Sequence, residues 1–210
     1  MAGMRLAAPV FVLLLTPAAH AQTVEITPLA GVRFGGGNVN TNVRGEFEPG
    51  ASFELDDSAS FGVHVGYQLP DGEIELVYAR QSTRLQSDAP FAGVPIFDLA
   101  VDIWQLGGNY LFLDGDARLR PYVGVGLGLT RLVPEPAGLD DETRFSASFA
   151  AGAKLRLARH IGLRAEARGF FTVFGTEGAS FCSSQGTCGF AGTSQLMTQV
   201  DLRAGLILAF

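Results

Sequence analysis

Charged residues of both signs recur at every second position in two stretches near the carboxyl end of the sequence. Arg164, Glu166 and Arg168 form one series, and Asp201 with Arg203 forms the other. A spacing of two places such side chains on one face of a β-strand. Following the same alternation along the chain gives twelve charged residues that are predicted to share one interior: Glu25, Arg33, Glu73, Glu75, Arg120, Lys154, Arg156, Arg164, Glu166, Arg168, Asp201 and Arg203. Opposite charges enclosed together are expected to pair, because an unpaired charge away from water is costly. The alternative is that they line a path for an ion or a small solute.

Cys182 and Cys188 enclose five residues in a stretch rich in glycine and serine. In an exported protein this spacing predicts a disulfide that closes a short loop. A zinc site would need two further ligands close by, and residues 175–194 contain no histidine. The sequence therefore predicts no metal and no cofactor here.

The residues that could do acid–base or phosphate chemistry are few. His64 is predicted to point inward near Gln68 and Glu75, and His160 falls in a short turn; neither has a serine placed for nucleophilic catalysis. The acidic clusters at 54–57 and 140–142 are interpreted as solvated loop charge. The glycines of GVGLGL lie inside a predicted strand with no helix after it, so they do not form a nucleotide-binding loop. We do not expect an enzyme.

The elements that must position these residues are β-strands. Residues 195–210 alternate between an apolar face and a face that carries Asp201 and Arg203, and they end on Phe210. Similar alternation predicts eight strands, at residues 23–35, 59–69, 73–85, 99–113, 119–133, 144–157, 161–174 and 195–210. The connections between them alternate between long and short, as in an up-and-down barrel that crosses an outer membrane with short periplasmic turns and longer outer loops.

The amino terminus and the composition indicate export. Arg5, an apolar run from Leu6 to Leu15, and Ala19-His20-Ala21 predict a signal peptide over residues 1–21 that is cleaved after Ala21. The mature domain would be 22–210. Removing Arg5 from the 15 basic residues leaves 14 against 21 acidic ones, a net charge of −7 that argues against a nucleic-acid partner. The 27 glycines and 16 phenylalanines suit curved sheets with aromatic girdles.

The runs DDSASFGVHVGYQL, PDGEIELVYARQST, WQLGGNYLF and the terminal LILAF resemble the small eight-stranded outer-membrane β-barrel proteins, namely the OmpA-like transmembrane domain and the OmpW and opacity-protein groups. The resemblance implies an all-β, antiparallel, up-and-down transmembrane barrel in the outer membrane. It also implies that Phe210 is the assembly signal read by the barrel assembly machinery. The peptidoglycan-binding domain of full-length OmpA-like proteins is not expected, and neither is tethering to the cell wall.

Two roles remain open from the sequence. We expect a barrel plugged by its charged side chains, with a structural or surface-interaction role toward outer-membrane lipid, lipopolysaccharide or a host surface. The alternative is a narrow, OmpW-like channel for small solutes.

Overall fold

Eight long strands make up the body of the protein. A computed structural model describes residues 24–36, 39–40, 52–87, 94–113, 117–135, 140–174, 178–182, 188–192 and 196–210. The long strands are β1 (Val24–Gly35), β4 (Ser58–Leu69), β5 (Gly72–Ser87), β6 (Val94–Leu111), β7 (Leu119–Pro134), β8 (Glu142–Arg156), β9 (Ile161–Val173) and β12 (Leu196–Ala209). Four short strands are β2 (Val39–Asn40), β3 (Ser52–Leu55), β10 (Gly178–Cys182) and β11 (Cys188–Gly192). Within these described ranges, no helix is long and apolar enough to cross a membrane.

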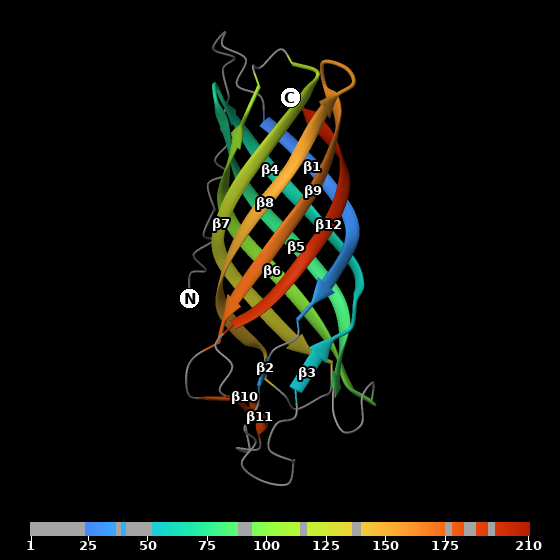
Figure 1. The fold of residues 1–210 in the computed structure, drawn as a ribbon, viewed down its shortest axis with the longest axis vertical. Coiled ribbons are helices and arrows are strands. Elements are labelled where there is room, and N and C mark those ends of the chain that lie inside the picture. Colours follow the sequence, from blue (N-terminus) through green and yellow to red (C-terminus); the bar gives the residue numbers. More distant parts are fainter. Residues whose placement is uncertain are drawn as a thin grey trace, which may run out of the picture.

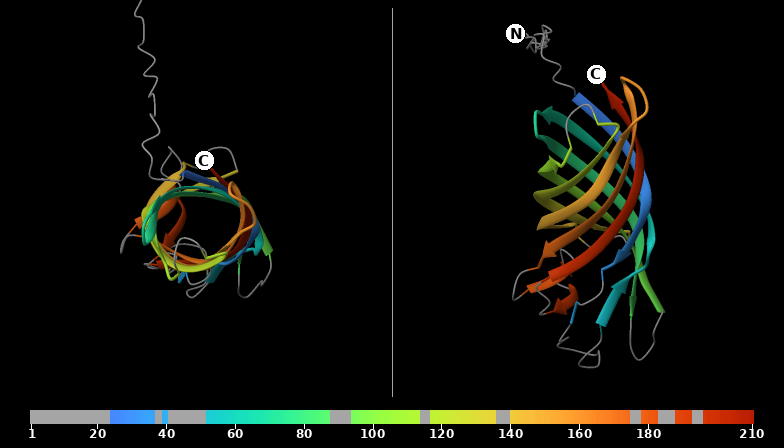
Figure 2. Two further views of the ribbon diagram at one scale, coloured as in Figure 1. Left: turned by 90° about the horizontal axis from the view of Figure 1, so that it is seen from above. Right: turned by 45° about the horizontal axis from the view of Figure 1, so that its top comes forward.

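The long strands close on themselves. Neighbours around the wall are β1, β4, β5, β6, β7, β8, β9 and β12, all antiparallel, and β12 pairs with β1. Seen along its axis the wall is a ring, and seen from the side its strands are tilted (Figures 1 and 2). Because every sheet edge is paired, the barrel leaves no strand edge open along its wall.

The two ends of the barrel differ. We call the end that carries the turn Pro70-Asp71, residues 157–160 and Ala209 the turn end; it lies at the top of Figure 1. We call the opposite end, where β2, β3, β10 and β11 lie, the loop end. The start of β1 and the end of β12 meet at the turn end, where the Phe210 amide donates to the Val24 carbonyl at 2.9 Å.

Alternation of side chains follows from the two-residue period of a strand. In β4 the odd-numbered Phe61, Val63, Val65 and Tyr67 are exposed, whereas His64 is buried. The other long strands show the same pattern, so the outer wall is a belt of aliphatic and aromatic side chains. Such a face is stable against lipid and costly against water.

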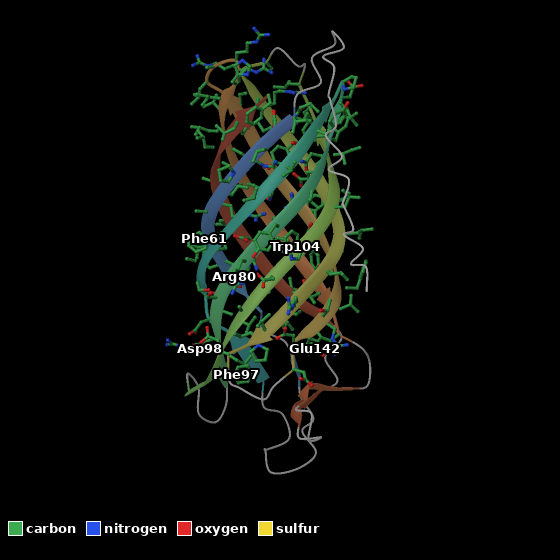
Figure 3. The ribbon with its side chains drawn as sticks, turned by 180° about the vertical axis from the view of Figure 1, so that it is seen from behind. Phe61, Arg80, Phe97, Asp98, Trp104 and Glu142 are labelled. Atoms are coloured by element: carbon green, nitrogen blue, oxygen red, sulfur yellow. The ribbon has the colours of Figure 1, made fainter. Side chains whose placement is uncertain are left out.

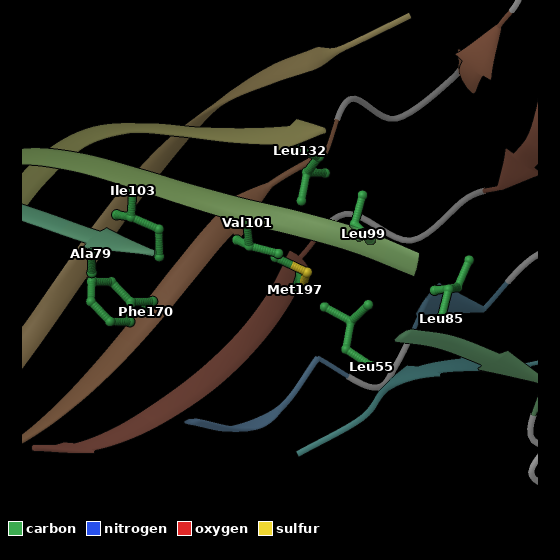
Figure 4. Close-up of a cluster of buried hydrophobic side chains, with 9 residues drawn as sticks. All are labelled: Leu55, Ala79, Leu85, Leu99, Val101, Ile103, Leu132, Phe170 and Met197. Carbon is green, nitrogen blue, oxygen red and sulfur yellow. The ribbon is translucent and has the colours of Figure 1, made fainter. Parts of the chain in front are cut away.

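The interior changes character along the barrel axis. Toward the loop end it is filled by a cluster of apolar side chains (Figure 4): Leu55, Ala79, Leu85, Leu99, Val101, Ile103, Leu132, Phe170 and Met197. Between this apolar cluster and the turn end, most of the enclosed side chains are polar or charged. A small barrel has an interior that its own side chains can fill, so the chain places its chemistry inside this wall.

The predicted eight-stranded barrel is confirmed, and the predicted boundaries of the long strands differ from the observed ones by a few residues. The sequence prediction missed β2, β3, β10 and β11 in the long connections. These strands are two to five residues long and too short to show a period of two. The predicted signal peptide lies outside the described residues.

Candidate functional site

The charged residues meet across the lumen, from opposite walls of the barrel. Arg164 and Arg168 lie on β9, and Glu75 lies on β5, four strands away around a ring of eight. Arg164 Nη2 donates to Glu75 Oε2 at 2.8 Å, and Arg168 Nη2 pairs with Glu75 Oε1. All three side chains are fully enclosed. The two walls are therefore joined through the centre of the barrel.

Glu166 is the centre of this network. Its carboxylate accepts from Arg164 Nη2 at 2.6 Å, from Arg168 Nε at 2.8 Å, from Arg203 Nη2 at 2.8 Å and from the Tyr122 hydroxyl at 2.7 Å. Three guanidinium groups thus share one carboxylate. Charge-assisted hydrogen bonds of this kind are the strong ones in a site from which water is largely excluded.

A second group lies toward the loop end. Arg33 donates from Nε and Nη2 to Asp201 Oδ2 at 3.1 and 2.9 Å, and the Ser60 hydroxyl donates to Asp201 Oδ1 at 2.6 Å. The Arg33 guanidinium also lies 5.0 Å from the centre of the Phe170 ring. Phe170 belongs to the apolar cluster, so the charged and apolar parts of the interior are in direct contact.

A third group lies toward the turn end. Lys154 Nζ donates to Glu25 Oε2 at 2.5 Å and to Glu73 Oε1 at 2.8 Å. Asn109 Nδ2 donates to both Glu73 and Glu75 at 2.8 Å, which links this group to the centre. The connected set, here called the lumen network, holds five acidic and five basic side chains: Glu25, Glu73, Glu75, Glu166 and Asp201 against Arg33, Lys154, Arg164, Arg168 and Arg203.

The structure brings together ten of the twelve charged residues predicted from the sequence and leaves two outside. Arg120 lies near the turn end and donates to the Leu113 carbonyl at 3.3 Å, and Arg156 is exposed there. Both occupy strand positions that were predicted to face the interior. These positions lie at the mouth of the barrel, however, where the wall no longer encloses the side chains. The predicted pairing of opposite charges between β9 and β12 is seen in the Glu166–Arg203 contact.

Several polar residues of the site were missed because they carry no charge. Tyr122, Asn109 and Ser60 complete the hydrogen bonding of the enclosed carboxylates. They occupy inward-facing alternate positions of their strands, and this alternation could have identified them as interior residues. The inward-facing Gly62 leaves room for a long side chain and for a close strand: a Cβ there would lie 3.0 Å from Arg203 Nη1 and 2.5 Å from the Tyr78 carbonyl oxygen.

A further polar group lies on the outer wall of the barrel. Asp102 accepts from the Tyr78 hydroxyl at 3.0 Å and pairs with Arg80 at 3.2 Å. The Trp104 ring packs against the Tyr78 ring with centres 4.3 Å apart and planes tilted by 35°. Trp104 lies nearer the turn end than Arg80 does (Figure 3). An aromatic pair beside an ion pair is typical of the level at which a barrel leaves the hydrocarbon layer.

The acidic clusters contact neighbouring strands at the loop end. Asp57 Oδ1 accepts from the Gly35 amide at 3.2 Å, and Asp141 and Glu142 form ion pairs with Arg131 and Arg144. Asp57, Asp140 and Asp141 are exposed, in keeping with their interpretation as solvated charge, whereas the Glu142 side chain is only 13% exposed.

One set of side chains has metal-ligand types. His64, Glu75 and Glu166 offer ligand atoms within 4.8 Å of one another, and all three are buried. His64 Nδ1 lies 3.4 Å from Glu75 Oε2. However, both carboxylates already accept hydrogen bonds from guanidinium groups. A divalent cation would meet three arginines, so this set does not fit a metal.

The backbone of the last long connection brings the two cysteines opposite each other. Cys182 of β10 and Cys188 of β11 are direct partners in an antiparallel hairpin. Opposed residues in such a pair have Cα atoms about 4.5 to 5.5 Å apart, which falls in the range that a disulfide requires. The placement of the backbone is compatible with the predicted bond, which stays a prediction.

Comparisons with solved structures agree with this architecture. The chain is similar to Neisserial surface protein A, with a TM-score of 0.58 and 17% identity over 90% of this chain and 97% of that one. It is also similar to the outer membrane protein OprG from Pseudomonas aeruginosa, with a TM-score of 0.64 and 14% identity over 90% and 96% of the two chains. The N-terminal β-barrel domain of Pseudomonas aeruginosa OprF gives a TM-score of 0.52 and 16% identity over 90% and 98%. At these identities the similarity shows the fold.

Comparison with families gives a stronger result. No curated protein sequence matches the chain. A family model described as the outer membrane protein beta-barrel domain matches residues 10–191, which is most of the sequence. Together with the closed eight-stranded barrel and its apolar outer belt, this match shows that the chain belongs to the outer membrane protein β-barrel domain family, whose place is the outer membrane.

Proposed function

We propose that this protein is an outer-membrane barrel whose lumen is closed by its own side chains, and that it acts in envelope structure or surface contact. The observation that carries the proposal is the lumen network, in which Arg164 and Arg168 of β9 reach Glu75 on the opposite wall. Five acidic and five basic groups balance in charge, and the apolar cluster fills the interior beyond them. Removing one member would leave a buried charge unpaired, so the network resists opening.

The accompanying proposals concern place and partners. Residues 1–21 would be removed on export, the turn end would face the periplasm, and the loops would face outward toward lipopolysaccharide or a host surface. The lipid-facing belt supports contact with outer-membrane lipid. We propose no catalytic role, since His64 is enclosed by the network and His160 Nδ1 lies 2.9 Å from the Ala209 carbonyl oxygen.

Conductance across a planar bilayer tests the closed lumen. Protein purified from outer membranes is inserted as the wild type, as Arg168→Ala within the network and as Arg131→Ala on the exposed outer wall. We expect no single-channel steps from the wild type or from Arg131→Ala, and brief openings from Arg168→Ala because that change removes a cross-lumen contact. Stable steps from the wild type would overturn the proposal in favour of a narrow channel for small solutes.

Surface contact needs a separate measurement. Intact cells that carry the wild type are compared with cells in which the outer connections are replaced by short glycine-serine linkers, while the barrel is unchanged. Loss of adhesion or of lipopolysaccharide binding on this replacement supports a surface role. Equal binding by the two kinds of cell would exclude the surface role, and only the structural role would then remain.

A further inference from the structure

The last peptide group of the chain is held at both of its polar atoms. The carbonyl oxygen of Ala209 accepts a hydrogen bond from the ring Nδ1 of His160 at 2.9 Å. The amide of Phe210, on the other side of the same peptide bond, donates to the Val24 carbonyl at 2.9 Å. Because a peptide group is planar, these two contacts together fix the orientation of the bond that carries the terminal residue.

The two contacts come from different neighbours of β12. Val24 begins β1, which lies on one side of β12, and His160 ends the turn between β8 and β9, which lies on the other side. The Ala209 amide also donates to the His160 carbonyl at 3.0 Å, so one residue of the turn bonds both the amide and the carbonyl of Ala209. The end of the chain and this turn lie side by side at the turn end of the barrel (Figures 1 and 2).

The contact continues a ladder that would otherwise end one row earlier. The register between β12 and β9 runs as far as Leu208 and Ile161. In a hydrogen-bonded pair of an antiparallel ladder, both bonds come from backbone amides. Between Ala209 and His160, the imidazole ring supplies the bond to the Ala209 carbonyl. The ring thus extends the pairing to the residue before the end of the chain.

The turn itself is closed by backbone hydrogen bonds, which hold the ring in place. The amides of Leu157 and Ala158 both donate to the Ile161 carbonyl, at 3.0 and 2.9 Å. A carbonyl oxygen can only accept a hydrogen bond, so the His160 Nδ1 that faces Ala209 must carry a proton. The imidazolium and one of the two neutral tautomers of the ring meet this condition.

We propose that His160 is a positioning residue for the terminal Phe210, and that it completes the closure of the barrel at the turn end. Terminal residues fray unless they are tied to the fold. The Phe210 side chain is 71% exposed, so its placement depends mainly on the hydrogen bonds of its peptide group. This role is separate from the lumen network and does not depend on whether the barrel conducts.

Hydrogen exchange and trimming by a carboxypeptidase test this role. Isotope-labelled wild type, His160→Ala and His160→Asn are extracted from outer membranes and compared in detergent micelles. In His160→Ala the amides of Ala209 and Phe210 should exchange about fivefold faster, because one hydrogen bond of the chain end is lost. Release of Phe210 by the carboxypeptidase, followed by mass spectrometry, should quicken by a similar factor. Asparagine presents an amide donor near the position of Nδ1, so His160→Asn should return both rates to within about twofold of the wild type.

Three controls make the result specific. Arg159→Ala changes the neighbouring exposed residue of the same turn and should leave both rates unchanged. The amide of Leu202, inside β12, should exchange at the same rate in every variant, which shows that the effect is local. Nitrogen NMR signals of the neutral His160 ring in the wild type should place the proton on Nδ1.

Three results would each overturn the inference. One is a pair of wild-type rates in His160→Ala. Another is an equal acceleration in His160→Asn or in Arg159→Ala, because the turn as a whole rather than the ring donor would then hold the chain end. The third is a neutral His160 ring with its proton on Nε2, which could not donate to Ala209. This last measurement uses the wild type, so it decides the question even where a variant fails to fold.

Discussion

Replacing Glu166 by glutamine removes one charge from the lumen network without changing the shape of the side chain. Glu166 accepts five hydrogen bonds from four side chains: Arg164, Arg168, Arg203 and Tyr122. In the variant, Arg164 and Arg168 keep their ion pairs with Glu75. The ion pair that Arg203 keeps is a 3.6 Å contact between its Nε and Asp201, and its guanidinium also lies 5.8 Å from the centre of the Phe170 ring. The five-to-five balance becomes four acidic groups against five basic ones. The glutamine amide also turns two donors toward neighbours that are themselves donors.

Breaking a buried ion pair by removing one partner costs about 3–5 kcal/mol, because a charge is left without compensation. We expect Glu166→Gln to lower the free energy of unfolding by about this amount. Urea unfolding in lipid vesicles measures it, followed by fluorescence of Trp104, the one tryptophan of the chain, which is 52% exposed on the outer wall. Loss of heat-modifiable migration on gels gives a second readout.

Two further variants decide the interpretation. Asp98→Asn breaks the exposed Arg84–Asp98 pair and should leave the unfolding curve unchanged, since solvent screens that contact. Glu166→Gln/Arg203→Gln restores the charge balance and should recover about 1 kcal/mol or more relative to the single variant. A loss below about 1 kcal/mol in Glu166→Gln would refute the claim that the network holds the barrel closed.

Deleting Phe210 should lower the folded fraction in the outer membrane, because its amide bonds to Val24 where β12 closes onto β1; immunoblots of unheated membranes measure this, and unchanged levels would count against an assembly role. Cys182 and Cys188 should resist thiol reagents on intact cells until a reductant is added, and the closed loop should contribute about 2–3 kcal/mol at most. Labelling of both cysteines without reductant would disprove the bond. Amino-terminal sequencing of membrane-inserted protein should begin at Gln22, and a start at Met1 would exclude cleavage after Ala21.

The sequence by itself determined the wall of this protein. Strands that face lipid on one side and an enclosed lumen on the other must alternate, so a period of two identifies both the strands and the parity of each side chain. For this reason His64, Arg164 and Asp201 could be assigned to the interior before the structure was known. The order of the strands followed as well, because short and long connections in alternation are those of an up-and-down barrel, in which consecutive strands pair.

Only the tertiary structure decided which interior residues meet. The alternation along a strand shows which face a side chain is on. It does not show the level of that residue along the barrel axis or which residue lies on the opposite wall, because these depend on the tilt and stagger of the closed sheet. The Arg168–Glu75 contact across the lumen, and the exclusion of Arg120 and Arg156 from the network, come from that geometry.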